Sequence, residues 1–139
     1  MRGLLLDVNV QNHCDHLRRL LAEIDLASTM AELRLEVTTL SAVGIPLDID
    51  DRNLWIHCQR LEFVLLTENR NHEGPDSLQA TLDDSWSEGR LPVLTLASKR
   101  RLERDHDYAL AVAEEIADVL FGIAESGQFL DESRIWVPR

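Results

Sequence analysis

The sequence has few cysteines and no long apolar run, and each shortage excludes a class of protein. Only Cys14 and Cys58 are present, which is too few for a disulfide framework or a cysteine-based metal site. The longest apolar runs, residues 63–66 and 91–97, fall far below the roughly 18 residues that a membrane span needs. The N-terminus also lacks a signal-peptide pattern. We therefore expect a cytoplasmic protein that does not enter the membrane and whose two thiols are reduced and buried.

Basic side chains are outnumbered by acidic ones, at 14 against 25, so the formal net charge is −11. This charge repels polyanions at long range and excludes a protein that coats nucleic acid nonspecifically. Contact with a phosphodiester would need a local basic patch or a metal ion. The sequence has one cluster of basic residues, at the start of the last predicted helix. A solvated helix face explains this cluster, yet the cluster is also the only patch able to hold a phosphate backbone. The candidate nucleic-acid-binding residues are therefore Lys99, Arg100, Arg101 and Arg104.

The hydrophobic pattern of this 139-residue chain, a length that fits one domain, alternates between strands and helices. Strands are expected at residues 3–7, 33–39, 63–67 and 91–96, and helices at 11–27, from 51, from 76 and at 98–124. Residues 31–37 also fit a helix, which is the alternative to the second strand. Such alternation indicates crossover connections. The sequence therefore predicts an α/β fold with a mostly parallel central sheet flanked by helices. The tail, residues 128–139, packs either on the body or on a partner.

Polar side chains gather where predicted strands end and helices begin, which is where open parallel sheets bind their ligands. Clustered carboxylates repel one another, so such a pocket either raises the pKa of some of them or holds a cation. Oxygen ligands favour Mg²⁺ or Mn²⁺ over zinc. The set comprises Asp7, Asn9, Asp50, Asp51, Thr67, Glu68, Asn69 and Asn71.

Most of these polar residues also have an ordinary structural explanation. Asp50, Asp51 and Asp76 stand where helix-capping residues are common, and asparagines stabilise tight turns. Asp7 is different, because an acid that closes a buried central strand caps nothing unless a helix begins at once. Asp7 is therefore the strongest single candidate for a functional side chain.

Two segments, LLLDVN and DIDDRNLWIHCQRLEFVLLTENRN, resemble PIN-like domains, particularly the small stand-alone members of that family. In those members the first strand ends in Asp, a later helix begins with an acidic residue, and the next strand ends in Thr-x-Asp-x-Asp. The resemblance covers about residues 3–75 and more loosely the rest. It implies that residues 1–139 form a single PIN-like domain with a three-layer sandwich. The family cleaves RNA with metal ions held by acidic residues, and its members often act as toxins or processing nucleases.

The resemblance assigns roles position by position. Asp7 matches the first catalytic and metal-binding acid, and Asp51, or Asp50 beside it, matches the acid at the helix start. Thr67 matches the threonine that supports the metal site, with Asn9 nearby. Residues of this kind would hold Mg²⁺ or Mn²⁺ and cleave single-stranded RNA.

The match departs from the family pattern after the third predicted strand. Asn69 and Asn71 replace the Asp-x-Asp pair, and neutral amides bind a divalent ion less strongly. Glu68 offers a carboxylate one residue out of register, and neighbouring strand residues point to opposite faces. Asp76 is a second candidate substitute. An endoribonuclease with a weakened or rearranged acidic site is thus expected.

The alternative is a non-catalytic PIN-like module that binds a partner through the pocket or the tail. An antitoxin-like protein or a second copy of the chain stays open as that partner. A phospho-acceptor receiver domain is disfavoured, because Asn69 would stand where its acceptor aspartate belongs.

Overall fold

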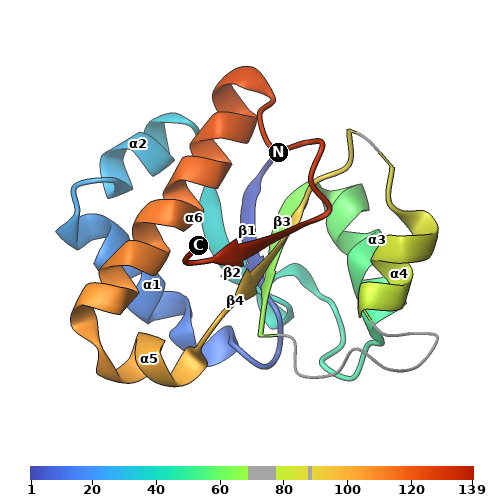
Figure 1. The fold of residues 1–139 in the computed structure, drawn as a ribbon, viewed down its shortest axis with the longest axis horizontal. Coiled ribbons are helices and arrows are strands. Elements are labelled where there is room, and N and C mark those ends of the chain that lie inside the picture. The colour runs from blue at the N-terminus through green and yellow to red at the C-terminus, as the bar shows by residue number, and fades with distance from the viewer. Residues whose placement is uncertain (69–77, 88) are drawn as a thin grey trace.

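The computed structural model describes residues 1–68, 78–87 and 89–139, in which one parallel sheet lies between two layers of helices (Figure 1). The strand order is β2-β1-β3-β4-β5, and every neighbouring pair is parallel. The predicted α/β sandwich is therefore confirmed. The strands are β1 (Gly3–Leu6), β2 (Glu36–Thr39), β3 (Phe63–Thr67), β4 (Val93–Leu96) and β5 (Arg134–Val137).

Helices cover both faces of the sheet and bury a separate apolar core on each (Figure 1). One layer contains α1 (Cys14–Glu23), α2 (Ala27–Glu32), α5 (Lys99–Arg104) and α6 (His106–Ser126), and the other contains α3 (Asp51–Leu61) and α4 (Leu78–Ser85). Successive strand residues point to opposite faces. Leu4 and Leu6 of β1 accordingly lie in the α1/α6 core, whereas Leu5 lies in the α3/α4 core. Within the described residues, no helix combines the length and apolar character needed to cross a membrane.

The start of β1 accepts only glycine. Gly3 has a φ of +140°, and a Cβ atom there would lie 2.0 Å from the carbonyl oxygen of Glu36. Glu36 is the partner of Gly3 in β2, so the missing side chain lets these two strands approach. The uninterrupted apolar residues that follow make β1 a central strand, with β2 on one side and β3 on the other.

Two of the predicted helices are interrupted. The helix expected over residues 11–27 follows a short 3₁₀ turn (Gln11–His13) and ends at Glu23; Asp25 then has a φ of 60° before α2 begins. The long helix expected over residues 98–124 is broken at Asp105, whose backbone is extended. The Asp105 side chain accepts a hydrogen bond from the backbone N–H of Tyr108 and so starts α6 as its N-cap.

The C-terminal tail packs on the body of the domain and supplies a strand that the sequence pattern did not predict. Its four residues pair with β4 in register, from Val93 with Arg134 to Leu96 with Val137. Ile135 and Val137 join the α1/α6 core. Because side chains alternate along a strand, Arg134 and Trp136 project from the opposite face, toward the α3/α4 side.

Candidate functional site

Asp7 and Thr67 meet at the point where the strand order reverses. The chain runs from β1 to β2 on one side and returns to β3 on the other, which makes the β1/β3 pair the switch point where such sheets bind ligands. The Thr67 hydroxyl donates to Oδ2 of Asp7 at 2.8 Å, and the backbone N–H of Val8 donates to Oδ1 at 2.7 Å. Asp7 is only 8% exposed, so these two donors compensate for much of its lost hydration.

Asn9 ties the loop after β1 to the end of β3. Its Nδ2 donates to the carbonyl oxygen of Glu68, and its Oδ1 accepts from the Glu68 backbone N–H at 3.2 Å. The side-chain amide of Asn9 therefore bonds both the N–H and the carbonyl oxygen of Glu68. This contact holds the loop after β1 against the end of β3. The predicted site residues Asn69, Asn71 and Asp76 lie outside the described residues.

The two acids at the start of α3 have different surroundings. Asp50 is the N-cap, and its two carboxylate oxygens accept from the backbone N–H (2.7 Å) and the side-chain amide (3.0 Å) of Asn53. Asp51 is half-buried, and its Oδ2 accepts from the backbone N–H of Leu78, the first residue of α4, at 2.9 Å. Burial raises the pKa of Asp51, and the negative charge of Asp7 raises it further. Asp51, rather than the capping Asp50, is thus the better candidate partner of Asp7.

A row of side chains extends from Asp7 across the α3/α4 face of the sheet. Thr67 is paired with Thr95 of β4, and Thr95 with Trp136 of β5. Thr95 is fully buried, and its hydroxyl has no hydrogen-bond partner among the described residues. The same holds for Nε and Nη2 of Arg134. Burial lowers the pKa of Arg134, whereas Asp83 and Asp51 act in the opposite direction. Buried polar atoms without partners are uncommon, so Thr95 and Arg134 are noteworthy on this face of the sheet.

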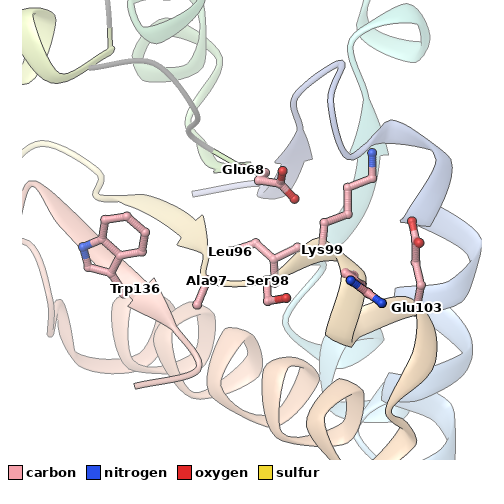
Figure 2. A pocket seen from close by; sticks show the side chains of 8 residues that line it. Glu68, Leu96, Ala97, Ser98, Lys99, Glu103 and Trp136 are labelled. Carbon is pink, nitrogen blue, oxygen red and sulfur yellow. The ribbon is translucent and has the colours of Figure 1, made fainter. Parts of the chain in front are cut away.

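A pocket of about 540 Å³ opens at the end of this row, a size that suits a small ligand (Figure 2). Lys99 and Arg100 line it, whereas Arg101 lies outside its lining. Arg101 forms an ion pair with Asp105 at 3.3 Å, and its guanidinium lies 4.2 Å from the centroid of the Tyr108 ring. Arg104 is exposed and also lies outside the lining. The full lining is Glu68, Leu96, Ala97, Ser98, Lys99, Arg100, Glu103 and Trp136.

The structure thus places Asp7, Asn9 and Thr67 in contact and Asp51 at the same end of the sheet. Sequence reasoning missed three residues of this region: Thr95, Arg134 and Trp136. The alternation of Arg-Ile-Trp-Val in the tail is the one signal that would have indicated a strand with Arg134 and Trp136 on a single face. No three carboxylate, imidazole or thiolate side chains of the described residues are grouped as a metal site requires.

Comparison with protein-family models, with curated proteins and with solved structures found no match for this chain.

Proposed function

We propose that this chain is a PIN-like domain that cleaves single-stranded RNA with Mg²⁺ or Mn²⁺. The observation that carries the proposal is the buried Asp7–Thr67 pair at the switch point of the sheet, with the half-buried carboxylate of Asp51 close enough to respond to the charge of Asp7. Two acids and a threonine in these places, on strands and a helix in this order, follow the family pattern that residues 3–75 resemble.

The donor set fits a hard divalent cation. A carboxylate oxygen accepts more than one hydrogen bond, so both oxygens of Asp7 keep lone pairs after binding Val8 and Thr67. Burial raises the pKa of Asp51 most, the charge of Asp7 raises it further, and a cation between the two carboxylates would relieve both effects. Asp7 and Asp51 would hold the ion, which when bound supplies an activated water and neutralises charge on the phosphate. Thr67 would hold the Asp7 carboxylate in position.

Thermal melting with Mn²⁺, combined with an RNA cleavage assay, tests the proposal. Millimolar Mn²⁺ should raise the melting temperature of the wild type through mass action, and Asp7→Asn or Asp51→Asn should abolish both the rise and the cleavage. Asp50→Asn is the matched control. It removes a negative charge from the residue directly before Asp51, and asparagine caps a helix as well as aspartate does. A wild type that melts alike with and without Mn²⁺ and cleaves no RNA would refute the proposal.

The second candidate is a non-catalytic PIN-like module that binds a partner. It is favoured by Asn69 and Asn71, which remove two negative charges from the positions where the family holds its cations. A wild type that leaves single-stranded RNA intact but binds it without added metal would favour this candidate.

A further inference from the structure

We infer that the pocket between the ends of β4 and β5 and the start of α5 is a subsite for one nucleotide of the RNA strand, with Trp136 stacking on its base and Lys99 and Arg100 holding its phosphate. The inference rests on the proposed function, because it takes the RNA to be the same strand whose phosphodiester reaches Asp7. The volume of this pocket, about 540 Å³, falls within the range of small-ligand pockets.

Trp136 supplies the aromatic wall. It is 46% exposed although its strand partner Thr95 is fully buried. The guanidinium of Arg134, two residues earlier on the same face, lies 5.9 Å from the Trp136 ring centroid, a distance that permits a cation–π contact. Figure 2 shows the indole on one side of the pocket, across from Lys99. An exposed indole of this kind is the platform on which unpaired bases stack.

Lys99 and Arg100 supply the positive charge. Both follow β4 closely and line the pocket, and neither has an ion-pair partner among the described residues. In a chain with a net charge of −11, two such cations side by side are a local exception. The carboxylates of Glu68 and Glu103 line the same pocket. This mixed lining suits a single phosphate joined to a flat ring better than it suits a polyphosphate.

Glu68 connects the pocket to the loop that follows Asp7. Glu68 lines it, and the backbone of Glu68 is bonded to Asn9, which lies beside Asp7. Trp136 and Asp7 stand at opposite ends of one row that crosses β5, β4, β3 and β1. Three spacings between strands, at about 4.8 Å each, separate them by roughly 14 Å. A few nucleotides of one extended strand span such a distance, so a base on Trp136 and a phosphodiester at Asp7 can belong to one RNA.

Binding of a fluorescein-labelled, eight-nucleotide single-stranded RNA of mixed sequence, measured in EDTA, tests the subsite. All proteins carry Asp7→Asn so that the RNA stays intact. Adding Trp136→Ala should weaken binding about tenfold, and Trp136→Phe should restore most of it. Adding Lys99→Gln with Arg100→Gln should also weaken binding and reduce its dependence on salt. The charge control is Arg60→Gln, which removes an exposed cation from the end of α3, at the opposite edge of the sheet.

The inference is overturned if Trp136→Ala binds RNA as tightly as its parent, if Arg60→Gln weakens binding as much as the pocket substitutions, or if the parent binds no RNA. Melting curves establish that each variant is folded. Cleavage by the otherwise wild-type protein with Mn²⁺ separates this inference from the proposed function. Binding that depends on Trp136 without any cleavage would leave the subsite standing and refute the nuclease. Cleavage whose KM is unchanged by Trp136→Ala would support the nuclease and refute the subsite.

Discussion

The Thr67 hydroxyl donates a 2.8 Å hydrogen bond to Oδ2 of Asp7 and thereby joins the carboxyl ends of β1 and β3. Both side chains are buried, and the backbone N–H of Asp7 donates to the carbonyl oxygen of Leu66 at 2.9 Å. A carboxylate in such a place is expensive to desolvate unless donors surround it. The strand register therefore positions both the acid and the donor that stabilises it.

A double-mutant cycle on this pair should reveal the coupling. Thr67→Val removes the donor but keeps the branched shape, and Asp7→Ala removes the acceptor. We expect a coupling free energy of about 1–3 kcal/mol, because hydrogen bonds to charged groups contribute about this much. Urea unfolding of the four proteins measures it. Strictly additive effects would mean that the hydrogen bond contributes nothing to stability.

Asp51→Asn should stabilise the protein near neutral pH. Burial raises the pKa of Asp51 above its ordinary value of 3.8, so the folded state binds its proton at a higher pH than the unfolded state. The wild type therefore loses stability as the pH rises through the folded-state pKa, and regains it as the pH falls toward the unfolded value. Asparagine does not ionise, and its carbonyl oxygen can still accept from Leu78.

Urea midpoints at about pH 7 and about pH 4 check this expectation. The variant should unfold at higher urea than the wild type at the first pH, and the difference should shrink at the second. Saturating Mn²⁺ should also reduce the difference in urea midpoint between the variant and the wild type at about pH 7, because the ion binds only the wild-type carboxylate. An Asp51→Asn protein that is less stable than the wild type at both pH values would contradict the destabilising burial of the Asp51 charge.

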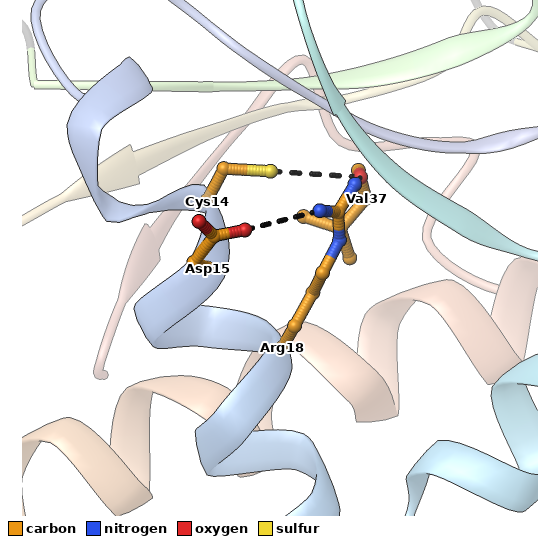
Figure 3. A network of polar contacts seen from close by, with 4 residues as sticks. All are labelled: Cys14, Asp15, Arg18 and Val37. Carbon is orange, nitrogen blue, oxygen red and sulfur yellow. Dashed lines mark hydrogen bonds and ion pairs between the residues drawn. The ribbon is translucent and has the colours of Figure 1, made fainter.

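Both cysteines should resist labelling in the folded protein, as their predicted burial, now confirmed, implies. Burial raises the pKa of Cys58 to about 12, and burial also raises the pKa of Cys14. The Cys14 thiol donates to the carbonyl oxygen of Val37 at 3.6 Å (Figure 3). The Arg18 guanidinium donates to the same oxygen. A thiol reagent at about pH 8 should modify both residues rapidly in urea and neither in buffer, since the thiolate is the reactive form. Rapid labelling of Cys58 without denaturant would contradict its burial.

The sequence predicted the central part of the fold because that part depends on local pattern. The apolar runs of β1 and β3 and the capping Asp50 of α3 are visible in a few consecutive residues. The break at Asp105 was missed because the apolar stripe continues through Leu102 and Ala109 on both sides of it. The Asp105 side chain caps α6 and so ends the helix that a periodic pattern of more than twenty residues had predicted to be continuous.

The site residues also divide into those that the local sequence pattern predicts and those that it does not. Parallel strands bring their carboxyl ends to one edge, so the proximity of Asp7 and Thr67 follows from recognising the strands. Trp136 and Arg134 depend on β5, a four-residue edge strand that forms only by pairing with β4. Strand pairing of that kind is a tertiary contact between segments about forty residues apart, and a single sequence carries little local trace of it.

Restoring the acids at positions 69 and 71 gives the most direct test of whether this chain is an enzyme. The PIN-like pattern that the sequence resembles has carboxylates at the positions of Asn69 and Asn71, so under the proposed function the Asn69→Asp/Asn71→Asp variant adds two negative charges to the metal-binding set. Greater charge raises affinity for divalent ions. Without metal the added repulsion should lower the melting temperature, and with millimolar Mn²⁺ the variant should gain more stability than the wild type.

Cleavage of single-stranded RNA by the same variant should be faster than cleavage by the wild type, most clearly in Mn²⁺, because the ion would then be held by a fuller set of oxygen ligands. Gln128→Glu is a control of similar chemistry, since this exposed residue follows α6 at the amino edge of the sheet. It should change neither metal binding nor cleavage. A double variant that binds Mn²⁺ tightly yet leaves RNA intact would show that the surroundings of Asp7 are not arranged for a phosphodiester, and the non-catalytic module would then be the better account of the fold.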